Sequence, residues 1–171
     1  MQEYLTIFIP AFTTLFVIID PIGLAPIFAG LTDGTSAKHQ RKMALKGTVV
    51  ATFIMLFFAI VGEPFLGALG IQMYAMRVAG GIMLFFIAME MVFEKRNERK
   101  QENAEKLEEQ FDDISVFPVA IPLISGPGSI ATIMLLMSAQ QDNFEDQMVV
   151  ISAMVSVIAL TLIAFLLAVP R

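Results

Sequence analysis

The sequence contains no cysteine, and this absence excludes several kinds of site at once. Disulfides, thiol catalysis and cysteine-based zinc or iron–sulfur centres all require that residue. The chain also has a single histidine, His39, which lies in a polar stretch beside Gln40 and Arg41. Neither HExxH nor GxSxG spacing occurs, so nothing here is typical of a zinc protease or a serine hydrolase. We therefore expect a protein that is not an enzyme.

Charged residues are scarce as well, at 16% of the chain, while 57% of the residues are hydrophobic. Soluble domains usually carry about 25% charged and 45–50% apolar residues. The net charge is −5 and no basic face is evident, which argues against nucleic-acid binding. A soluble domain of 171 residues would have to bury more apolar surface than its interior can hold. This composition predicts one compact unit in a lipid bilayer.

The apolar residues lie in five long blocks. A helix that spans about 30 Å of hydrocarbon needs roughly 20 mainly apolar residues. The blocks cover residues 4–32, 47–62 with 45–46 added, 74–93, 116–141 and 147–170. The first block contains 29 residues with Asp20 as its one charge, so a straight helix there would be about 43 Å long. We predict an all-α, polytopic membrane protein with five transmembrane helices, the first of them tilted or broken.

Cationic residues predict how the chain is oriented. Ten of the eleven Lys and Arg residues lie within or next to the loops at 33–44 and 94–115 or after the last block, and only Arg77 departs from this. Such a bias marks the cytoplasmic side. The start, Met-Gln-Glu-Tyr, has no cation, which favours a retained first helix over a signal peptide. We expect a multi-pass protein of the cell inner (plasma) membrane, with its N-terminus outside and both loops cytoplasmic.

A charged stretch divides the chain into two parts. Residues 94–113 mix five cations with eight acids, a composition typical of a solvated helix or flexible connector, with regulation or partner binding as the alternative. We predict a first three-helix repeat at 1–93, a charged cytoplasmic linker at 94–115, and a second, incomplete repeat at 116–171.

Each part opens with an apolar segment rich in helix breakers. Proline inside a helix removes a hydrogen bond and clashes with the preceding turn, and broken backbone in a membrane must be buried in protein or line a wet cavity. The two segments align at an offset of 106, with Asp20-Pro21 against Gly126-Pro127. Three helices per half would start the second half on the opposite face, which gives an inverted repeat. Paired interrupted helices point to a transporter binding site near the midplane; the alternative is two proline kinks that serve packing.

The breaker motifs resemble the MarC family of inner-membrane proteins, and the resemblance extends over essentially the whole chain. It rests on Asp20-Pro21-x-Gly23-x-x-Pro26-Ile27-Phe28, Gly62-Glu63, Gly80-Gly81-Ile82-x-Leu84 and Phe117-Pro118-x-Ala120-Ile121-Pro122-Leu123-x-x-Gly126-Pro127. The resemblance implies a carrier related to the lysine-exporter-like superfamily, with six helices in two inverted sets of three. Some members are linked to transport of small neutral amino acids such as glycine and alanine. This chain stops at Arg171 after the fifth block, so we expect a 3+3 repeat that lacks its last helix.

The two breaks supply the candidate binding residues. A helix that ends inside the membrane offers N–H groups at a positive N-terminus, which suit a carboxylate, or carbonyls at a negative C-terminus, which suit an ammonium group or a cation. Small side chains at the breaks would let a small zwitterion approach the backbone. The expected substrate-binding residues are Asp20, Pro21, Gly23, Pro26, Ser125, Gly126, Pro127, Gly128, Ser129 and Thr132.

We therefore expect a transporter of small neutral solutes, amino acids in particular, that works by alternating access between the two interrupted helices. The alternative is a channel-like or efflux membrane protein without amino-acid specificity. The expected partners are the lipid bilayer and the small solute, with no cofactor and no metal. Asp20 has two compatible interpretations. It is a site of H⁺ or Na⁺ coupling or of contact with the substrate amine, or it is the N-cap of a half-helix that opens at Pro21.

Overall fold

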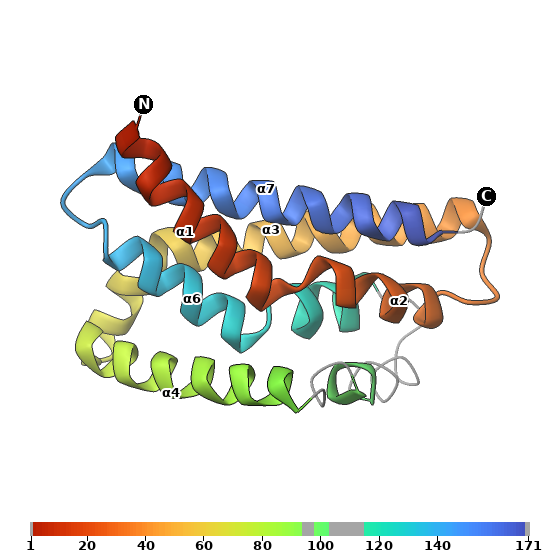
Figure 1. Cartoon of the computed structure of the whole chain (residues 1–171), viewed down its shortest axis with the longest axis horizontal. Helices are drawn as coiled ribbons and strands as arrows, with labels where there is room; N and C mark the ends of the chain where they lie inside the picture. The colour runs from red at the N-terminus through yellow and green to blue at the C-terminus, as the bar shows by residue number, and fades with distance from the viewer. Residues whose placement is uncertain (1, 94–97, 103–114, 170–171) are drawn as a thin grey trace.

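The chain folds into a bundle of helices, and no strand occurs among the residues that the structure describes (Figure 1). The structure is a computed structural model and describes residues 2–93, 98–102 and 115–169. Residues 98–102 form one short helical turn. The elements in chain order are α1 (Gln2–Ile19), α2 (Pro21–Leu31), α3 (Ala37–Ala68), α4 (Met73–Val92), η1 (Ser115–Ile124), α6 (Pro127–Ser138) and α7 (Phe144–Ala168).

Most of these helices are long and apolar enough to cross a membrane. Four candidate spans meet that test among the described residues, at Tyr4–Leu31, Ala37–Ala68, Tyr74–Val92 and Phe144–Ala168. The pair η1 and α6 is bent by 55° and makes a fifth if the two are taken as one broken span. The expectation of an all-α, polytopic membrane protein is confirmed.

Large apolar side chains cover the outside of the bundle. Phe53 on α3 is 68% exposed, Phe85 on α4 is 60% exposed, and Leu167 on α7 is 80% exposed. Apolar surface on this scale would drive association in water. In a bilayer the same side chains face lipid tails, which carry no such penalty.

The interior lies between the first broken pair and the two long helices α3 and α7. Phe28 on α2 stacks on Phe165 on α7 with ring centroids 4.4 Å apart, and both rings are fully buried. Leu15 on α1, Met55 on α3 and Met154 on α7 are equally buried. This packing fixes where α1 ends and α2 begins, because both are held against α7.

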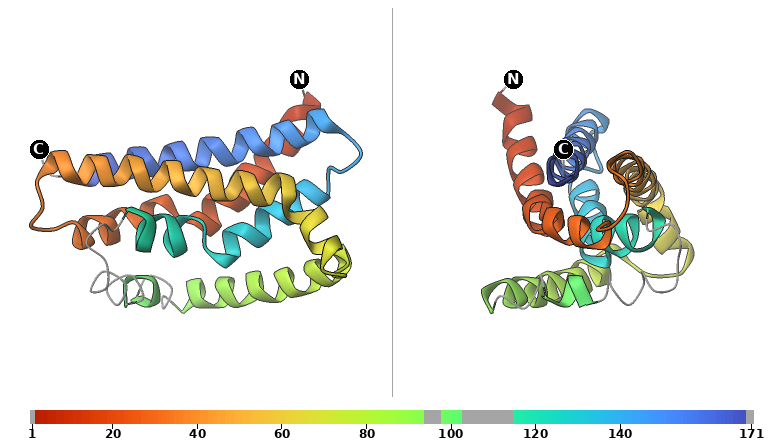
Figure 2. Two further views of the ribbon diagram at one scale, coloured as in Figure 1. Left: turned by 180° about the vertical axis from the view of Figure 1, so that it is seen from behind. Right: turned by 90° about the vertical axis from the view of Figure 1, so that its right-hand side faces the viewer.

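The helices of the two parts of the chain pack reciprocally. α7 lies along both α1 and α2, α3 lies along both η1 and α6, and α3 and α7 pack against each other. Figures 1 and 2 show that α1–α2 runs from one end of the bundle to the other, while η1–α6 runs in the opposite direction. Each unbroken helix therefore supports the broken helix of the other part, as an inverted repeat requires. The domain boundaries themselves stay a prediction.

Two expected boundaries are wrong. The loop placed at 33–44 ends at Ser36, because its hydroxyl accepts a hydrogen bond from the N–H of His39 (3.3 Å) and starts α3 at Ala37. The second apolar block was expected to end at residue 62, yet α3 continues to Ala68 with Pro64 inside it.

Of the linker at 94–115, residues 98–102 are helical and Ser115 already belongs to η1. The remainder, 94–97 and 103–114, lies outside the described residues.

Candidate functional site

The first break is a single residue wide and is organised by Asp20. This residue has φ 59° and ψ 66°, which turns the chain out of α1. Its carboxylate then accepts a hydrogen bond from the N–H of Gly23 at 3.0 Å, and Pro21 is the first residue of α2. A left-handed residue ends a helix, and an Asp before proline begins one. The N-cap interpretation of Asp20 is confirmed, while ion coupling at Asp20 stays a prediction.

The second break has the same order of parts but a different cap. Gly126 is the N-cap of α6 and Pro127 its first residue, so the two N-caps lie 106 positions apart, as the motif alignment predicts (126 minus 20). A methyl group on Gly126 would lie 2.6 Å from the carbonyl oxygen of Pro122. Only glycine fits this close approach of backbone to backbone.

The approach to the second break is itself bent at two prolines. Phe117 (φ −120°, ψ 124°) and Ile121 (φ −127°, ψ 123°) leave the helical conformation. Each of these residues precedes a proline, and the proline ring disfavours the helical region for its neighbour. η1 therefore reaches the second break as two short turns, packed along α3.

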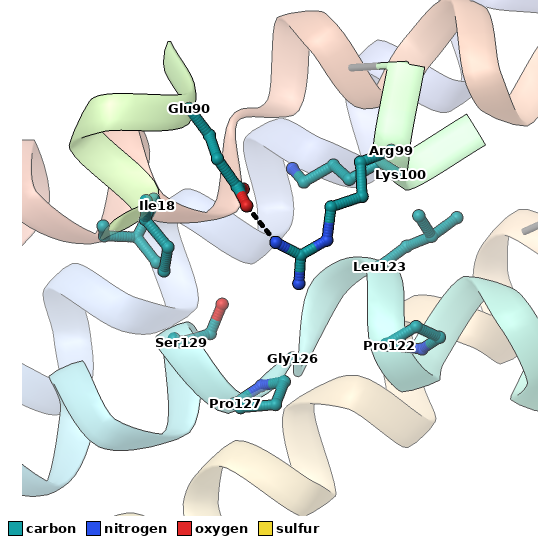
Figure 3. Close-up of a pocket in the computed structure, with 11 residues that line it drawn as sticks. Ile18, Glu90, Arg99, Lys100, Pro122, Leu123, Gly126, Pro127 and Ser129 are labelled. Carbon is teal, nitrogen blue, oxygen red and sulfur yellow. Dashed lines mark hydrogen bonds and ion pairs between the residues drawn. The ribbon is translucent and has the colours of Figure 1, made fainter. Parts of the chain in front are cut away.

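The end of α1, just before the first break, meets the second break at one cavity, which Ile18 lines and residues 20–26 do not. A methyl group on Gly128 would lie 3.6 Å from Cγ2 of Ile18 near the end of α1 and 2.5 Å from Cδ1 of Ile87 on α4. Beside this contact is a cavity of about 150 Å³ (Figure 3). Its lining residues are Ile18, Ile87, Glu90, Arg99, Lys100, Pro122, Leu123, Gly126, Pro127, Gly128 and Ser129. Segments more than a hundred residues apart in the chain thus share one hollow.

Four of the ten predicted binding residues line this cavity, namely Gly126, Pro127, Gly128 and Ser129. The other six do not line it. Pro21 is buried, Pro26 is exposed, and Gly23 donates its N–H to Asp20. The hydroxyls of Ser125 and Thr132 are buried, and each donates to a backbone carbonyl of its own segment, Ala120 and Gly128 respectively, at 2.7 Å.

Ser129 differs from the other hydroxyl residues at the break. It is only 4% exposed, and its oxygen points into the cavity (Figure 3). Within the described part of the chain this hydroxyl forms no hydrogen bond, whereas Ser125 and Thr132 are satisfied by backbone carbonyls. The Ser129 oxygen opens onto the cavity and is not among the enclosed polar atoms that lack a partner. Ser129 is therefore the group on α6 that is available to a bound molecule.

Charged side chains form the other wall of the cavity. Glu90 near the end of α4 is ion-paired with Arg99, and Lys100 donates through Nζ to the carbonyl oxygen of Ile19 at 3.2 Å. Sequence reasoning did not include these three residues in the site, because Glu90 was near a span end and the two cations were in the solvated linker. The available sign was a carboxylate at the end of an apolar block, nine residues before an arginine.

Helix ends of opposite sign meet at this cavity. The C-terminus of α1, at Ile19, carries negative partial charge, and the N-terminus of α6, at Gly126 to Ser129, carries positive partial charge. Lys100 lies on the negative end, as the electrostatics of a helix C-terminus favour. The cavity therefore has an anion-attracting side and a cation-attracting side. Among the described residues, no three His, Asp or Glu side chains form a group suited to a metal ion.

A second hollow of about 740 Å³ lies at the other end of α6, between that helix, α3 and α7. Glu63 accepts a hydrogen bond from the side-chain amide of Gln141 there. None of the ten predicted binding residues lines this hollow, and its walls are mainly apolar, with Met134 and Met137 among them. It is therefore not the cavity at which the end of α1 meets the second break.

Comparison with known proteins decides the family. Residues 5–170 match the sequence pattern of the family described as "MarC family integral membrane protein". This chain belongs to the MarC family. The MarC resemblance expected from the breaker motifs is thereby confirmed.

Similar proteins in other organisms bear related names. The chain is 40% identical to the UPF0056 membrane protein MJ0972 of Methanocaldococcus jannaschii, over 97% of this chain and 75% of that protein. It is 36% identical to the UPF0056 membrane protein YvbG of Bacillus subtilis, over 90% and 74%, and 36% identical to a UPF0056 membrane protein of Archaeoglobus fulgidus, over 88% and 70%. No solved structure matches this MarC chain. It is thus an integral membrane protein, and with four or five spans among its described residues it is a multi-pass one.

Proposed function

We propose that this MarC-family protein transports small neutral solutes, amino acids in particular, by alternating access, with the solute bound where the two broken helices meet. The observation that carries the proposal is the Ser129 hydroxyl, which is buried, directed into the cavity and without a partner in the described chain. This oxygen is not enclosed by protein, because among the described residues Gln40 Oε1 is the one enclosed side-chain atom without a partner. It opens onto the cavity, where a solute can accept its hydrogen bond.

The wall formed by α6 suits a carboxylate. The first-turn N–H groups of a helix have no partner within the helix, and the positive end attracts an anion. Gly128 and Ser129 occupy the first turn of α6 and line the cavity. A carboxylate here would accept from backbone N–H groups and from the Ser129 hydroxyl together.

The opposite wall suits a cation. Ile18, one residue before the end of α1, lines the cavity, so the negative pole of α1 lies beside it, and Lys100 on the carbonyl of Ile19 illustrates the preference for positive charge at this place. A molecule that carries both charges satisfies both walls. This is the arrangement in an amino-acid zwitterion.

The size of the cavity favours small solutes. Pockets for drug-sized ligands are usually about 300–1,000 Å³, and this one is about 150 Å³. An apolar cavity of about 150 Å³ accommodates benzene, a molecule of six heavy atoms. Glycine and alanine, with five and six heavy atoms, are therefore the solutes to test first.

We further propose that the cation-rich end of the bundle faces the cytoplasm, with the N-terminus outside and the protein in the cell inner (plasma) membrane. Figure 1 places residues 98–102 at the same end as the connection between α2 and α3, and the first turns of α3, which follow that connection, carry Lys38, Arg41 and Lys42. The positive-inside bias supports this orientation. The proposal involves no chemical conversion of the solute and no cofactor. Whether transport is coupled to H⁺ or Na⁺ is tested by the substitution of Asp20.

Uptake of labelled alanine and glycine into proteoliposomes that contain the purified chain tests the proposal. We expect saturable uptake that unlabelled alanine competes. Linear uptake without competition would favour the channel-like alternative.

Ser129→Ala tests the location of the site. A hydrogen bond to a charged group contributes about 1.5–3 kcal/mol, so the apparent affinity for alanine should fall about tenfold or more. Ser138→Ala is the matched control on the same helix, because that hydroxyl donates to the carbonyl of Leu135 and lies away from the cavity. Equal effects of the two substitutions would contradict this location of the site.

A further inference from the structure

We propose that Glu90 and Arg99 are the residues by which this cavity recognises a zwitterion, with Glu90 binding the ammonium group and Arg99 the carboxylate of the same ligand. This inference rests on the proposed function and assigns its specificity to residues outside the two breaks. In the structure the two side chains bind each other across the mouth of the cavity, above Ser129 (Figure 3). The ligand would replace that contact with one contact to each partner.

The first step concerns the cationic side of the ligand. The carbonyl of Ile19, the last residue of α1, already accepts from Lys100. A ligand ammonium group that enters the cavity therefore needs a different acceptor. Glu90 is the one carboxylate among the described residues that line the cavity.

The second step concerns the anionic side. The Ser129 hydroxyl and the N-terminus of α6 provide hydrogen-bond donors on one side of the cavity. Arg99 comes from the turn at 98–102 and contributes a guanidinium group at the opening. Guanidinium binds carboxylate in a two-pronged geometry. Arg99 can therefore close over a carboxylate that rests on α6.

The third step concerns the cost of separating the ion pair between Glu90 and Arg99. The side chain of Arg99 is 66% exposed and that of Glu90 27% exposed. Ion pairs that are open to water contribute little to stability, so separation of these two side chains costs little. A zwitterion then restores an opposite charge to each of them.

The charge count makes the recognition specific. Within the described part of the chain, Glu90 is the single negative side chain that lines the cavity, against Arg99 and Lys100. Loss of the Glu90 charge would leave two cations and a positive helix end, an environment that favours a carboxylate without an ammonium group. Loss of the Arg99 charge would weaken the anionic contact without this gain.

Binding to the purified 171-residue chain, measured by calorimetry with alanine, propionate and ethylamine, tests the assignment. Propionate is alanine without its amine, and ethylamine is alanine without its carboxylate. We expect the unmodified chain to bind alanine at least tenfold more tightly than either analogue. Because this comparison needs no variant, it does not depend on how a variant folds.

Glu90→Gln should reduce alanine affinity at least tenfold while propionate binds equally or more tightly. Arg99→Gln should reduce alanine affinity at least tenfold without a gain for propionate. Glu63→Gln and Arg77→Gln are the matched controls, because neither residue lines this cavity, and both should bind alanine normally.

The outcomes separate the two proposals. Alanine binding that weakens in Ser129→Ala but is unchanged in Glu90→Gln and Arg99→Gln would overturn the role of the ion pair and leave the proposed function standing. Tighter alanine binding in either variant would show that the pair competes with the ligand, which also overturns the inference. Failure of the unmodified chain to bind alanine would overturn both.

Discussion

Asp20 is the one non-glycine residue in the described chain with a positive φ, and it carries two structural tasks at once. It ends α1 through its left-handed backbone conformation, and it caps α2 through the N–H of Gly23. Asp and Asn tolerate this left-handed conformation better than other side chains, because their short polar groups bond locally. Aspartate at position 20 therefore meets both structural requirements.

Substitutions at Asp20 separate its structural task from its charge. Asn keeps the cap and the left-handed tolerance, so Asp20→Asn should change the free energy of unfolding by less than about 0.5 kcal/mol. Asp20→Ala loses a cap worth ~1 kcal/mol and meets a left-handed penalty of a further ~1 kcal/mol or more. Thermal melting in detergent gives both values.

The same Asp20→Asn variant tests ion coupling. If Asp20 binds H⁺ or Na⁺, uptake in Asp20→Asn should lose its dependence on pH or on the Na⁺ gradient. Uptake and ion dependence that both survive this substitution would exclude coupling at Asp20 and leave the cap as its role.

Among the elements, η1 and α6 depend most on backbone contact. The break between them brings Gly126 against the carbonyl of Pro122. The clash that a larger residue would make there is with backbone, so a small shift of a side chain cannot relieve it. Gly47 on α3 is similar, since a methyl group there would lie 2.9 Å from the carbonyl oxygen of Ser115. These two glycines let a bent segment lie directly against its neighbours.

Gly126→Ala should lower stability by about 1–3 kcal/mol, the usual cost of forcing atoms into a packed site. Gly81→Ala on α4 is the control, because nothing lies within 4 Å of the added methyl group. That change should be neutral or stabilise α4 by about 0.5–1 kcal/mol through helix propensity. Melting temperatures in detergent compare the two, and equal destabilisation would argue against the close approach at Gly126.

The ends of the elements were less predictable than their existence. α3 continues through Pro64 although a proline costs a helix hydrogen bond. Loss of one bond near the end of a 32-residue helix is offset when the rest of the helix is packed, here along η1, α6 and α7. A local pattern cannot report that offset, which is why the expected boundary at residue 62 was wrong.

At the scale of the whole molecule, α3 and α7 each pack on the broken helix of the other part, so the bundle has two distinct ends. The property to test is which of these ends faces the cytoplasm. The absence of cysteine from the 171-residue sequence helps, because an introduced cysteine is then the only thiol in that sequence for a reagent to label. Lys38→Cys lies near the end predicted to be cytoplasmic, and Asp142→Cys lies in the connection before α7 at the opposite end.

In intact cells, a membrane-impermeant thiol reagent should label Asp142→Cys and should label Lys38→Cys only after the membrane is opened. This result follows from the bias of Lys and Arg toward one end. The reverse pattern would contradict the proposed orientation, and labelling of both in intact cells would contradict a sealed multi-pass arrangement.

The sequence determined the class of fold, the membrane environment and the positions of both breaks. These properties depend on composition and on local backbone chemistry. The pairs Asp20-Pro21 and Gly126-Pro127, for example, affect the backbone only within a few residues. Ser129 was predicted as a binding residue for the same reason, since it follows a helix start that proline and glycine dictate.

Only the tertiary structure decided which polar groups face one cavity. The hydroxyls of Ser125 and Thr132 resemble that of Ser129 in the sequence, yet they are satisfied by nearby carbonyls. Glu90 meets Arg99 because α4 and the turn at 98–102 both reach the α6 break. Such contacts depend on how each helix is oriented in the bundle. That orientation is set by packing interactions distributed over the whole chain, which no local sequence pattern contains.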